Sequence, residues 1–119
     1  MKTYKELAAW QQARALVKRV YTVTNNFPAE EKFGLISQIR RSAISVPANI
    51  AEGIGRNTSR DTTQFLHISR GSLYELETLI ILSNDMNFIQ SAESNIFVEE
   101  INNCCRILNG LISHYEKKR

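Results

Sequence analysis

Apolar residues recur at intervals of three and four along most of the chain, the spacing that places side chains on one face of an α-helix. Four stretches carry such a stripe, at about residues 4–27, 28–55, 58–87 and 91–115. The connections between them are short, so consecutive helices should run antiparallel. No repeat, linker or low-complexity tract marks a second domain. The sequence therefore predicts an all-α fold, an antiparallel up-and-down four-helix bundle formed by residues 1–119 as one domain.

Local signals indicate how the predicted helices begin and end. Phe27 and Phe33 flank the start of the second helix, where they are placed to pack together as a hydrophobic staple. Gly55 follows that helix and is placed to take the left-handed cap conformation. Thr58, with Asp61 three residues later, resembles a capping box and predicts the start of the third helix.

The second helix carries an ordered polar row opposite its apolar stripe. A solvated helix face usually carries Lys, Glu and Gln, whereas Ser and Asn are poorer helix formers that suit defined hydrogen bonds. The row is either a solvated face or a polar seam against another helix or subunit, and we favour the seam. Its members are Gln38, Arg41, Ser45, Asn49, Glu52 and Arg56.

Pro47 lies in the middle of this helix, where a proline removes one backbone hydrogen bond at a cost of about 3 kcal/mol. The chain could break here, with Pro47 opening a new helix. The apolar stripe keeps its phase from Ile39 to Ile50, however, which favours one continuous helix kinked at Pro47. The kink would expose the Ala43 carbonyl to a partner.

The third helix has apolar residues behind its core stripe. Tyr74, Ile81 and Leu82 lie on this rear side together with Gly71, which permits a close approach of another helix. A helix that is apolar nearly all round is buried on both sides. A merely apolar surface is the alternative, but in so short a chain we expect a contact between subunits.

Composition limits the functional class without identifying it. The 119 residues are 43% hydrophobic and 23% charged, and 15 basic against 12 acidic residues give a net charge of +3. This small excess favours anionic partners. The amino-terminal sequence has no signal-peptide pattern, and no apolar run approaches the roughly 20 residues of a membrane span. Cys104 and Cys105 are adjacent and predict reduced thiols, so we expect a cytoplasmic protein with no membrane partner.

Catalytic and metal-binding patterns are missing from the sequence. His67 and His114 have no partner at ligand spacing, and neither follows a glutamate by three positions as di-metal bundles require. Glu52 is the best-placed acid or base, but glutamates in helices are usually only helix formers. We therefore expect no catalytic residue, no metal and no cofactor, with a hydrolase or metalloenzyme as a distant alternative.

Arginines gather about the predicted central hairpin, and their forked donors suit phosphate. Contacts of this kind would engage the RNA backbone, and an oligomer would multiply them. The carboxyl-terminal residue Arg119 adds to the basic total. The candidate nucleic-acid-binding residues are Arg40, Arg41, Arg56, Arg60, Arg70, Lys117 and Lys118.

Several runs of the sequence carry a family resemblance. The runs at 38–41, 45–47, 49–53, 65–66 and 71–75, which include SVPANIAEG, resemble the bacterial four helix bundle protein family. Its members were first noticed as products of intervening sequences in large-subunit ribosomal RNA genes, and they are often called ribosomal-protein-like. The similarity covers nearly the whole chain, and the SxPxNIAEG element is its specific part.

The resemblance implies an up-and-down bundle that assembles as a homopentameric ring. Related proteins include the accessory variability factor of diversity-generating retroelements, a basic pentamer that binds nucleic acid and partners a reverse transcriptase. No enzymatic activity is established for most members. The motif positions would serve subunit packing or a polar rim, and they are Arg41, Ser45, Pro47, Asn49, Glu52, Gly53 and Arg56. The chain departs mildly at Ser69, where the family often has alanine.

We therefore expect a non-enzymatic, homo-oligomeric protein, a pentamer by resemblance, that binds RNA or DNA through basic residues. The alternative is a protein-interaction scaffold that binds no nucleic acid. The residues expected at a subunit interface or polar seam are Ser45, Pro47, Asn49, Glu52, Gly53, Gly71, Tyr74 and Ile81.

Overall fold

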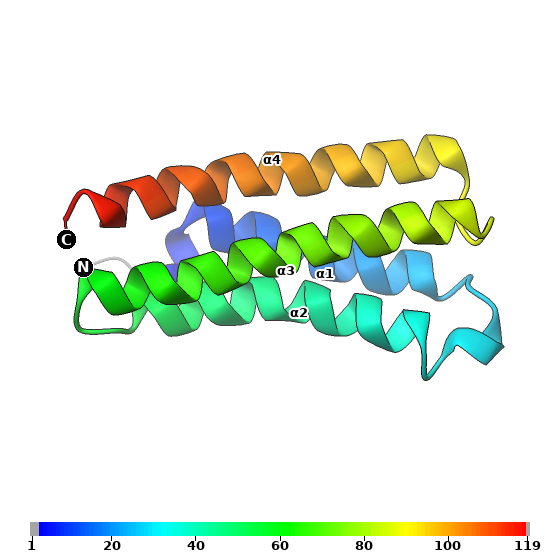
Figure 1. Ribbon diagram of the computed structural model, residues 1–119, viewed down its shortest axis with the longest axis horizontal. Helices are drawn as coiled ribbons and strands as arrows, with labels where there is room; N and C mark the ends of the chain where they lie inside the picture. The colour runs from blue at the N-terminus through cyan, green and yellow to red at the C-terminus, as the bar shows by residue number, and fades with distance from the viewer. Residues whose placement is uncertain (1–2, 119) are drawn as a thin grey trace.

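The computed structural model describes residues 3–118, so the expectation for Arg119 lies outside the described residues. Four antiparallel helices form a bundle (Figure 1): α1 (Ala8–Thr24), α2 (Leu35–Ile54), α3 (Ser59–Asp85) and α4 (Ser91–Glu116). Two short 3-10 helices, η1 (Tyr4–Glu6) and η2 (Ala29–Glu31), precede α1 and α2. Within the described residues there is no strand, and the predicted all-α four-helix bundle is confirmed.

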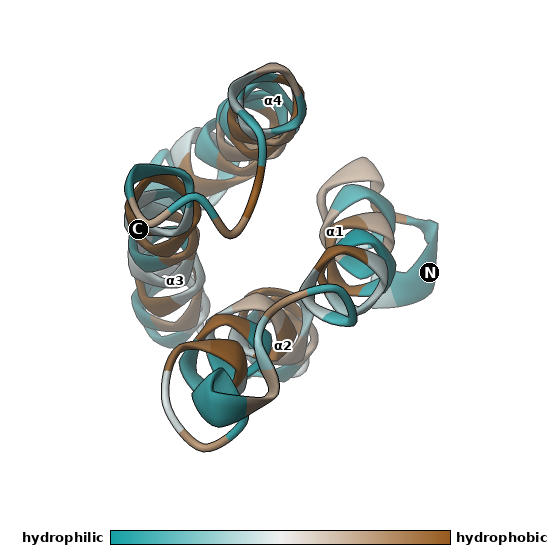
Figure 2. Cartoon of the chain, turned by 90° about the vertical axis from the view of Figure 1, so that its right-hand side faces the viewer, coloured by the Kyte–Doolittle hydropathy of each residue, from teal (hydrophilic) through white to brown (hydrophobic). Residues whose placement is uncertain are grey.

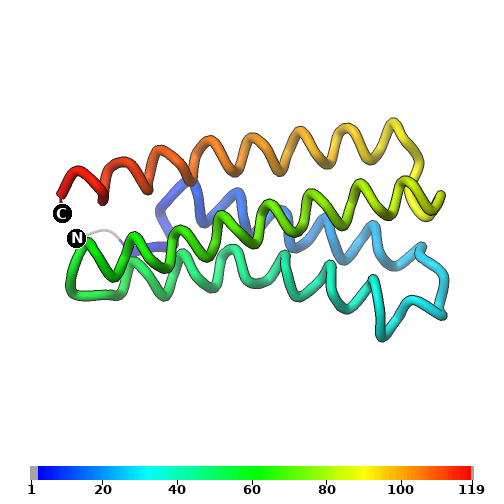
Figure 3. The backbone as a smooth tube through the Cα atoms, viewed as in Figure 1, coloured from blue at the N-terminus to red at the C-terminus, as the bar shows by residue number. Residues whose placement is uncertain are grey.

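The helices follow one another around the bundle in chain order, as the end-on view in Figure 2 shows. The pair α2–α3 is packed most extensively, and α1 and α4 are packed least. The molecule measures 45 × 25 × 20 Å. The α2–α3 turn and the end of α4 lie together at one end of the long axis, and the α1–α2 and α3–α4 connections lie at the other (Figure 3). Among residues 3–118, no helix combines the length and apolarity needed to cross a membrane.

The core forms where the four apolar stripes meet. Ser69 and Ser83 of α3 are buried among them, so the stripe of α3 is partly polar. All four helices contribute fully buried apolar side chains, as their three-and-four spacing predicts. The largest of these are Val20, Ile39, Val46, Ile50, Leu66, Leu73, Leu76, Ile80, Phe97, Ile101 and Leu108.

The signals at the helix ends have mixed outcomes. The predicted cap of α3 is confirmed, because the Asp61 backbone N–H donates to Thr58 Oγ1 at 3.1 Å. The staple is wrong: Phe27 is buried against Phe88, with ring centroids 5.7 Å apart, whereas Phe33 is 89% exposed. The helix η2 separates the two rings and delays the start of α2. The left-handed cap at Gly55 is also wrong, since its φ of −79° is right-handed.

The second helix continues through Pro47 without a break. This confirms one continuous helix in preference to two, and the kink itself stays a prediction. The expectation that the Ala43 carbonyl is open to a partner is wrong, because Ala43 is only 1% exposed. Ala43 lies on the core side of α2, where the other helices cover it.

Candidate nucleic-acid and subunit interfaces

Buried hydroxyl groups of α3 bind backbone carbonyls of α2. Ser69 Oγ donates to the carbonyl of Val46 at 2.8 Å, one residue before the proline. Thr62 Oγ1 donates to the carbonyl of Gly53 at 2.7 Å. A bond from a buried hydroxyl typically contributes about 1 kcal/mol, and it also fixes the register of the two helices. Ser69, the departure from the family pattern, therefore has a defined structural partner.

The polar row of α2 continues this pattern at the surface. Ser72 Oγ of α3 donates to Ser45 Oγ at 2.8 Å. Asn49 Nδ2 donates to the carbonyl and the hydroxyl of Ser45 at 2.8 and 2.9 Å. Gln38 Nε2 donates weakly to Glu75 Oε2 of α3 at 3.4 Å. Gln38 and Ser45 of α2 thus bond Glu75 and Ser72 of α3, and Asn49 bonds Ser45. We call these five residues the α2–α3 seam, which joins two helices of one chain.

Gly53 has a role inside the chain. A Cβ added at Gly53 would lie 2.8 Å from Phe65 Cβ and 3.1 Å from the Thr62 carbonyl. The residue is buried, so α2 and α3 approach closely only because position 53 has no side chain. Gly53 therefore serves packing between helices of one subunit, whereas Glu52 beside it is exposed.

The outer face of α3 carries an exposed apolar row. Ile68, Tyr74, Ile81 and Leu82 are each between 41% and 53% exposed. A Cβ added at Gly71, in the same helix, would meet nothing within 4 Å. The predicted apolar residues thus face outward, and position 71 leaves room for another helix.

The candidate basic residues do not form one cluster. Arg40 faces α1: its Nε donates to Thr24 Oγ1 at 3.0 Å, and its guanidinium lies 4.4 Å from the Tyr21 ring centroid. Arg70 faces α4, where it donates to Asn109 Oδ1 at 2.8 Å. Both side chains are therefore engaged within the chain.

The remaining basic candidates lie on exposed surface. Arg56 pairs with Glu52 at 3.5 Å and lies over the Phe65 ring at 4.5 Å. Arg60 opens α3 close to the α2–α3 turn. Lys117 and Lys118 follow α4 at the same end of the bundle (Figure 1). Arg41 is exposed on α2, well removed from this end.

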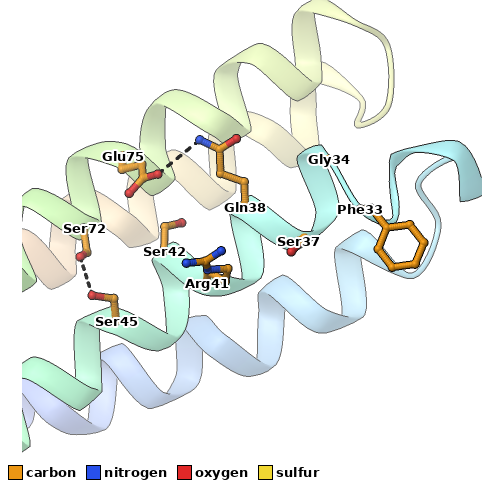
Figure 4. Close-up of a pocket in the computed structure, with 9 residues that line it drawn as sticks. All are labelled: Phe33, Gly34, Ser37, Gln38, Arg41, Ser42, Ser45, Ser72 and Glu75. Atoms are coloured by element: carbon orange, nitrogen blue, oxygen red, sulfur yellow. Dashed lines mark hydrogen bonds between the residues drawn. The ribbon is translucent and has the colours of Figure 1, made fainter.

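A shallow groove of about 570 Å³ lies where α2 begins, and Figure 4 shows it. The sequence reasoning missed this site, although serines recur on α2 around Arg41. The groove combines hydroxyl groups, one guanidinium and one exposed aromatic ring. Its lining residues are Phe33, Gly34, Ser37, Gln38, Arg41, Ser42, Ser45, Ser72 and Glu75.

The Cys104 thiol is buried, and the His67 imidazole is held by two neighbouring side chains. Both cysteines are free, and Cys104 is buried. Burial, together with the neighbouring Cys105, raises the pKa of the Cys104 thiol to about 12, so the group is protonated at neutral pH. His67 contacts Glu116 at 3.3 Å and Arg70 at 2.8 Å. In residues 3–118, no three His, Cys, Asp or Glu side chains are grouped so that they could hold a metal ion.

These features define a class of small helical-bundle protein in which side-chain hydrogen bonds join α2 to α3. The chain belongs to the family of 23S rRNA-intervening sequence proteins, whose model matches residues 5–110. This confirms the family resemblance of the sequence.

A solved structure shares the fold. It is a protein of unknown function from the S23 ribosomal protein family of Bacteroides thetaiotaomicron, with a TM-score of 0.81 and 21% identity. The match covers 88% of this chain and 95% of that one. No curated protein matches the sequence.

Proposed function

We propose that the protein is a non-enzymatic homo-oligomer, a pentamer, that binds RNA through basic side chains at one end of its bundle. The observation that carries this proposal is that Arg56 and Arg60, beside the α2–α3 turn, lie at the same end of the bundle as Lys117 and Lys118, which follow α4. All four are exposed. Basic groups on one end can engage several phosphates at once, and each contact releases counterions.

The opposite end supports this orientation, because it is acidic. Glu30, Glu31, Asp85 and Glu93 lie in or beside the two connections there, with Lys32 and Arg40 as the nearby bases. An RNA strand would therefore approach the bundle from the basic end. The description of the family refers to 23S rRNA intervening sequences, which favours RNA as the nucleic acid.

The apolar row of α3 supports the oligomeric part of the proposal. Tyr74, Ile81 and Leu82 would be buried by another copy. Because about half of each residue is already covered, burying the remainder would contribute about 1 kcal/mol per residue. Gly71 lets a helix backbone approach closely, as its open surroundings permit. Copies arranged in a ring would multiply the modest charge of each chain.

The surroundings of Cys104 and His67 support a non-enzymatic role. The Cys104 thiol is buried, and its raised pKa keeps it from acting as a thiolate nucleophile at neutral pH. His67 is held between Glu116 and Arg70, in the manner of a surface contact network.

Fluorescence anisotropy with a labelled RNA oligonucleotide tests the proposal. We expect affinity to fall steeply as salt rises, with a log–log slope close to the number of neutralised phosphates. The double variant Arg60→Glu/Lys117→Glu should bind at least tenfold more weakly and with a shallower slope. Lys18→Glu, a charge reversal on the exposed surface of α1, is the control. Absence of binding at low salt, or an equal effect of this control variant, would refute RNA binding through the basic end.

The alternative function is a protein-interaction scaffold that binds no nucleic acid. The exposed row of Tyr74, Ile81 and Leu82 favours it, because the same face could receive a helix of another protein. A protein that copurifies in stoichiometric amount from nuclease-treated lysate, and is lost in Tyr74→Ser, would support this alternative.

A further inference from the structure

Phe33 is unusually exposed for a large apolar side chain. It is 89% exposed, whereas the other exposed large apolar residues in the described part of the chain are all below 60%. The ring lies between η2 and α2, at the edge of the shallow groove where α2 begins (Figure 4). Lys32 Nζ lies 5.6 Å from the ring centroid, so a cation already accompanies the aromatic surface. An exposed ring beside a cation is a suitable platform for a flat, anionic ligand.

Arg41 is the cationic group inside the groove. Arg40, its neighbour, is held by Thr24 and Asn25, whereas the Arg41 side chain makes no hydrogen bond or ion pair with any residue in 3–118. Its guanidinium is therefore free to form a forked contact with a phosphate. The opposite wall of the groove carries the Glu75 carboxylate, which repels phosphate and so favours the Arg41 side.

Resting on the proposed RNA binding, we propose that this groove receives one unpaired nucleotide of a single-stranded RNA. The base stacks on Phe33, and its phosphate pairs with Arg41. The groove volume of about 570 Å³ is within the range of sites that hold a small ligand. Ser37 and Gln38 line the groove and offer hydrogen bonds to a base edge. A base within a duplex is already paired and stacked, so the site distinguishes unpaired from paired RNA.

The groove is within reach of RNA held at the basic end. Arg41 and Arg56 both belong to the polar row of α2, separated by about 22 Å along the helix axis at 1.5 Å per residue. Between them lie Ser45 and Asn49, hydrogen-bonded to each other and exposed in part. A single strand lying along this row would connect the two sites, since single-stranded binding sites typically span about 4–16 nucleotides.

The test compares a labelled 12-nucleotide single-stranded RNA with a hairpin of the same length. Phe33→Leu should weaken binding of the single strand about tenfold and leave hairpin binding unchanged, because stacking is lost and charge is kept. Phe33→Tyr should bind both RNAs as the unaltered protein does. Arg41→Gln should also weaken the single strand, whereas Arg106→Gln, an equal loss of charge on exposed α4 surface, should have no effect.

The outcomes separate this inference from the proposed function. If both RNAs bind in a salt-dependent manner and Phe33→Leu changes neither affinity, nucleotide binding in the groove is refuted and RNA binding by the protein stands. Failure of the unaltered protein to bind either RNA would overturn both. If Phe33→Leu sediments as a smaller oligomer, the ring belongs to a subunit contact, and nucleotide binding in the groove is likewise refuted.

Discussion

Replacing Gly53 by alanine tests the close packing of α2 on α3. The added Cβ would lie 2.8 Å from Phe65 Cβ and 3.1 Å from the Thr62 carbonyl, so the helices must move apart. The first atom adjoins the α3 backbone and the second belongs to it, and neither can turn aside as a flexible side-chain end would. Overpacking of this kind costs about 1–3 kcal/mol. The separation would also stretch the hydrogen bond from Thr62 to the Gly53 carbonyl.

The gain in helix propensity opposes this strain. Glycine to alanine within a helix is worth about 1 kcal/mol, so Gly53→Ala should be destabilised by up to about 2 kcal/mol. Gly110→Ala is the matched control, because a Cβ there meets nothing within 4 Å. That variant should be more stable than the unaltered protein by up to about 1 kcal/mol.

Urea unfolding at one protein concentration measures both variants, and the expected gap between them is the strain of about 1–3 kcal/mol. Equal stability of the two variants, with an unchanged urea dependence, would refute the close approach at position 53.

Three further predictions concern hydrogen bonding, ionisation and assembly. Ser69→Ala should lower the free energy of unfolding about 1 kcal/mol more than Ser83→Ala in urea unfolding, because Ser69 binds another helix and Ser83 only its own. Equal losses would contradict this. The pKa of the Cys104 thiol is about 12 in the folded state against 9.0 ordinarily, so the unfolded state loses this proton first as the pH rises. The free energy of unfolding should therefore fall between pH 9 and 12, by at most about 1.4 kcal/mol per pH unit. Cys104→Ala should lack this contribution in pH-dependent unfolding, and an unchanged pH profile would count against it. Gly71→Leu should reduce the oligomer mass measured by sedimentation while Gly110→Leu does not, because only Gly71 shares a helix with the exposed apolar row. An unchanged mass in both variants would show that α3 is not at the subunit interface.

The bundle could be predicted because apolar spacing reports directly which face of each helix is buried. The cap at Thr58 was predictable as well, since it depends only on residues three positions apart. The start of α2 was not, because η2 is a single turn without periodicity. Phe27 and Phe33 therefore looked equivalent in sequence, while their exposures of 6% and 89% depend on tertiary packing.

The polar row shows where a helical wheel stops being informative. The wheel places Ser45 and Asn49 opposite the apolar stripe, but it does not identify the neighbour that they face. In the fold Ser45 meets Ser72 of the same chain. Arg40 and Arg41 are adjacent in sequence yet about 100° apart around the helix, which is why one packs on α1 and the other opens into the groove.

Native mass spectrometry of the nuclease-treated protein, alone and with single-stranded RNA at low salt, measures oligomer size and RNA binding together. We expect a homo-oligomer, a pentamer, that gains the mass of RNA, and we expect this gain to be lost in Arg60→Glu/Lys117→Glu. A monomer at high concentration that gains no RNA mass would contradict both expectations.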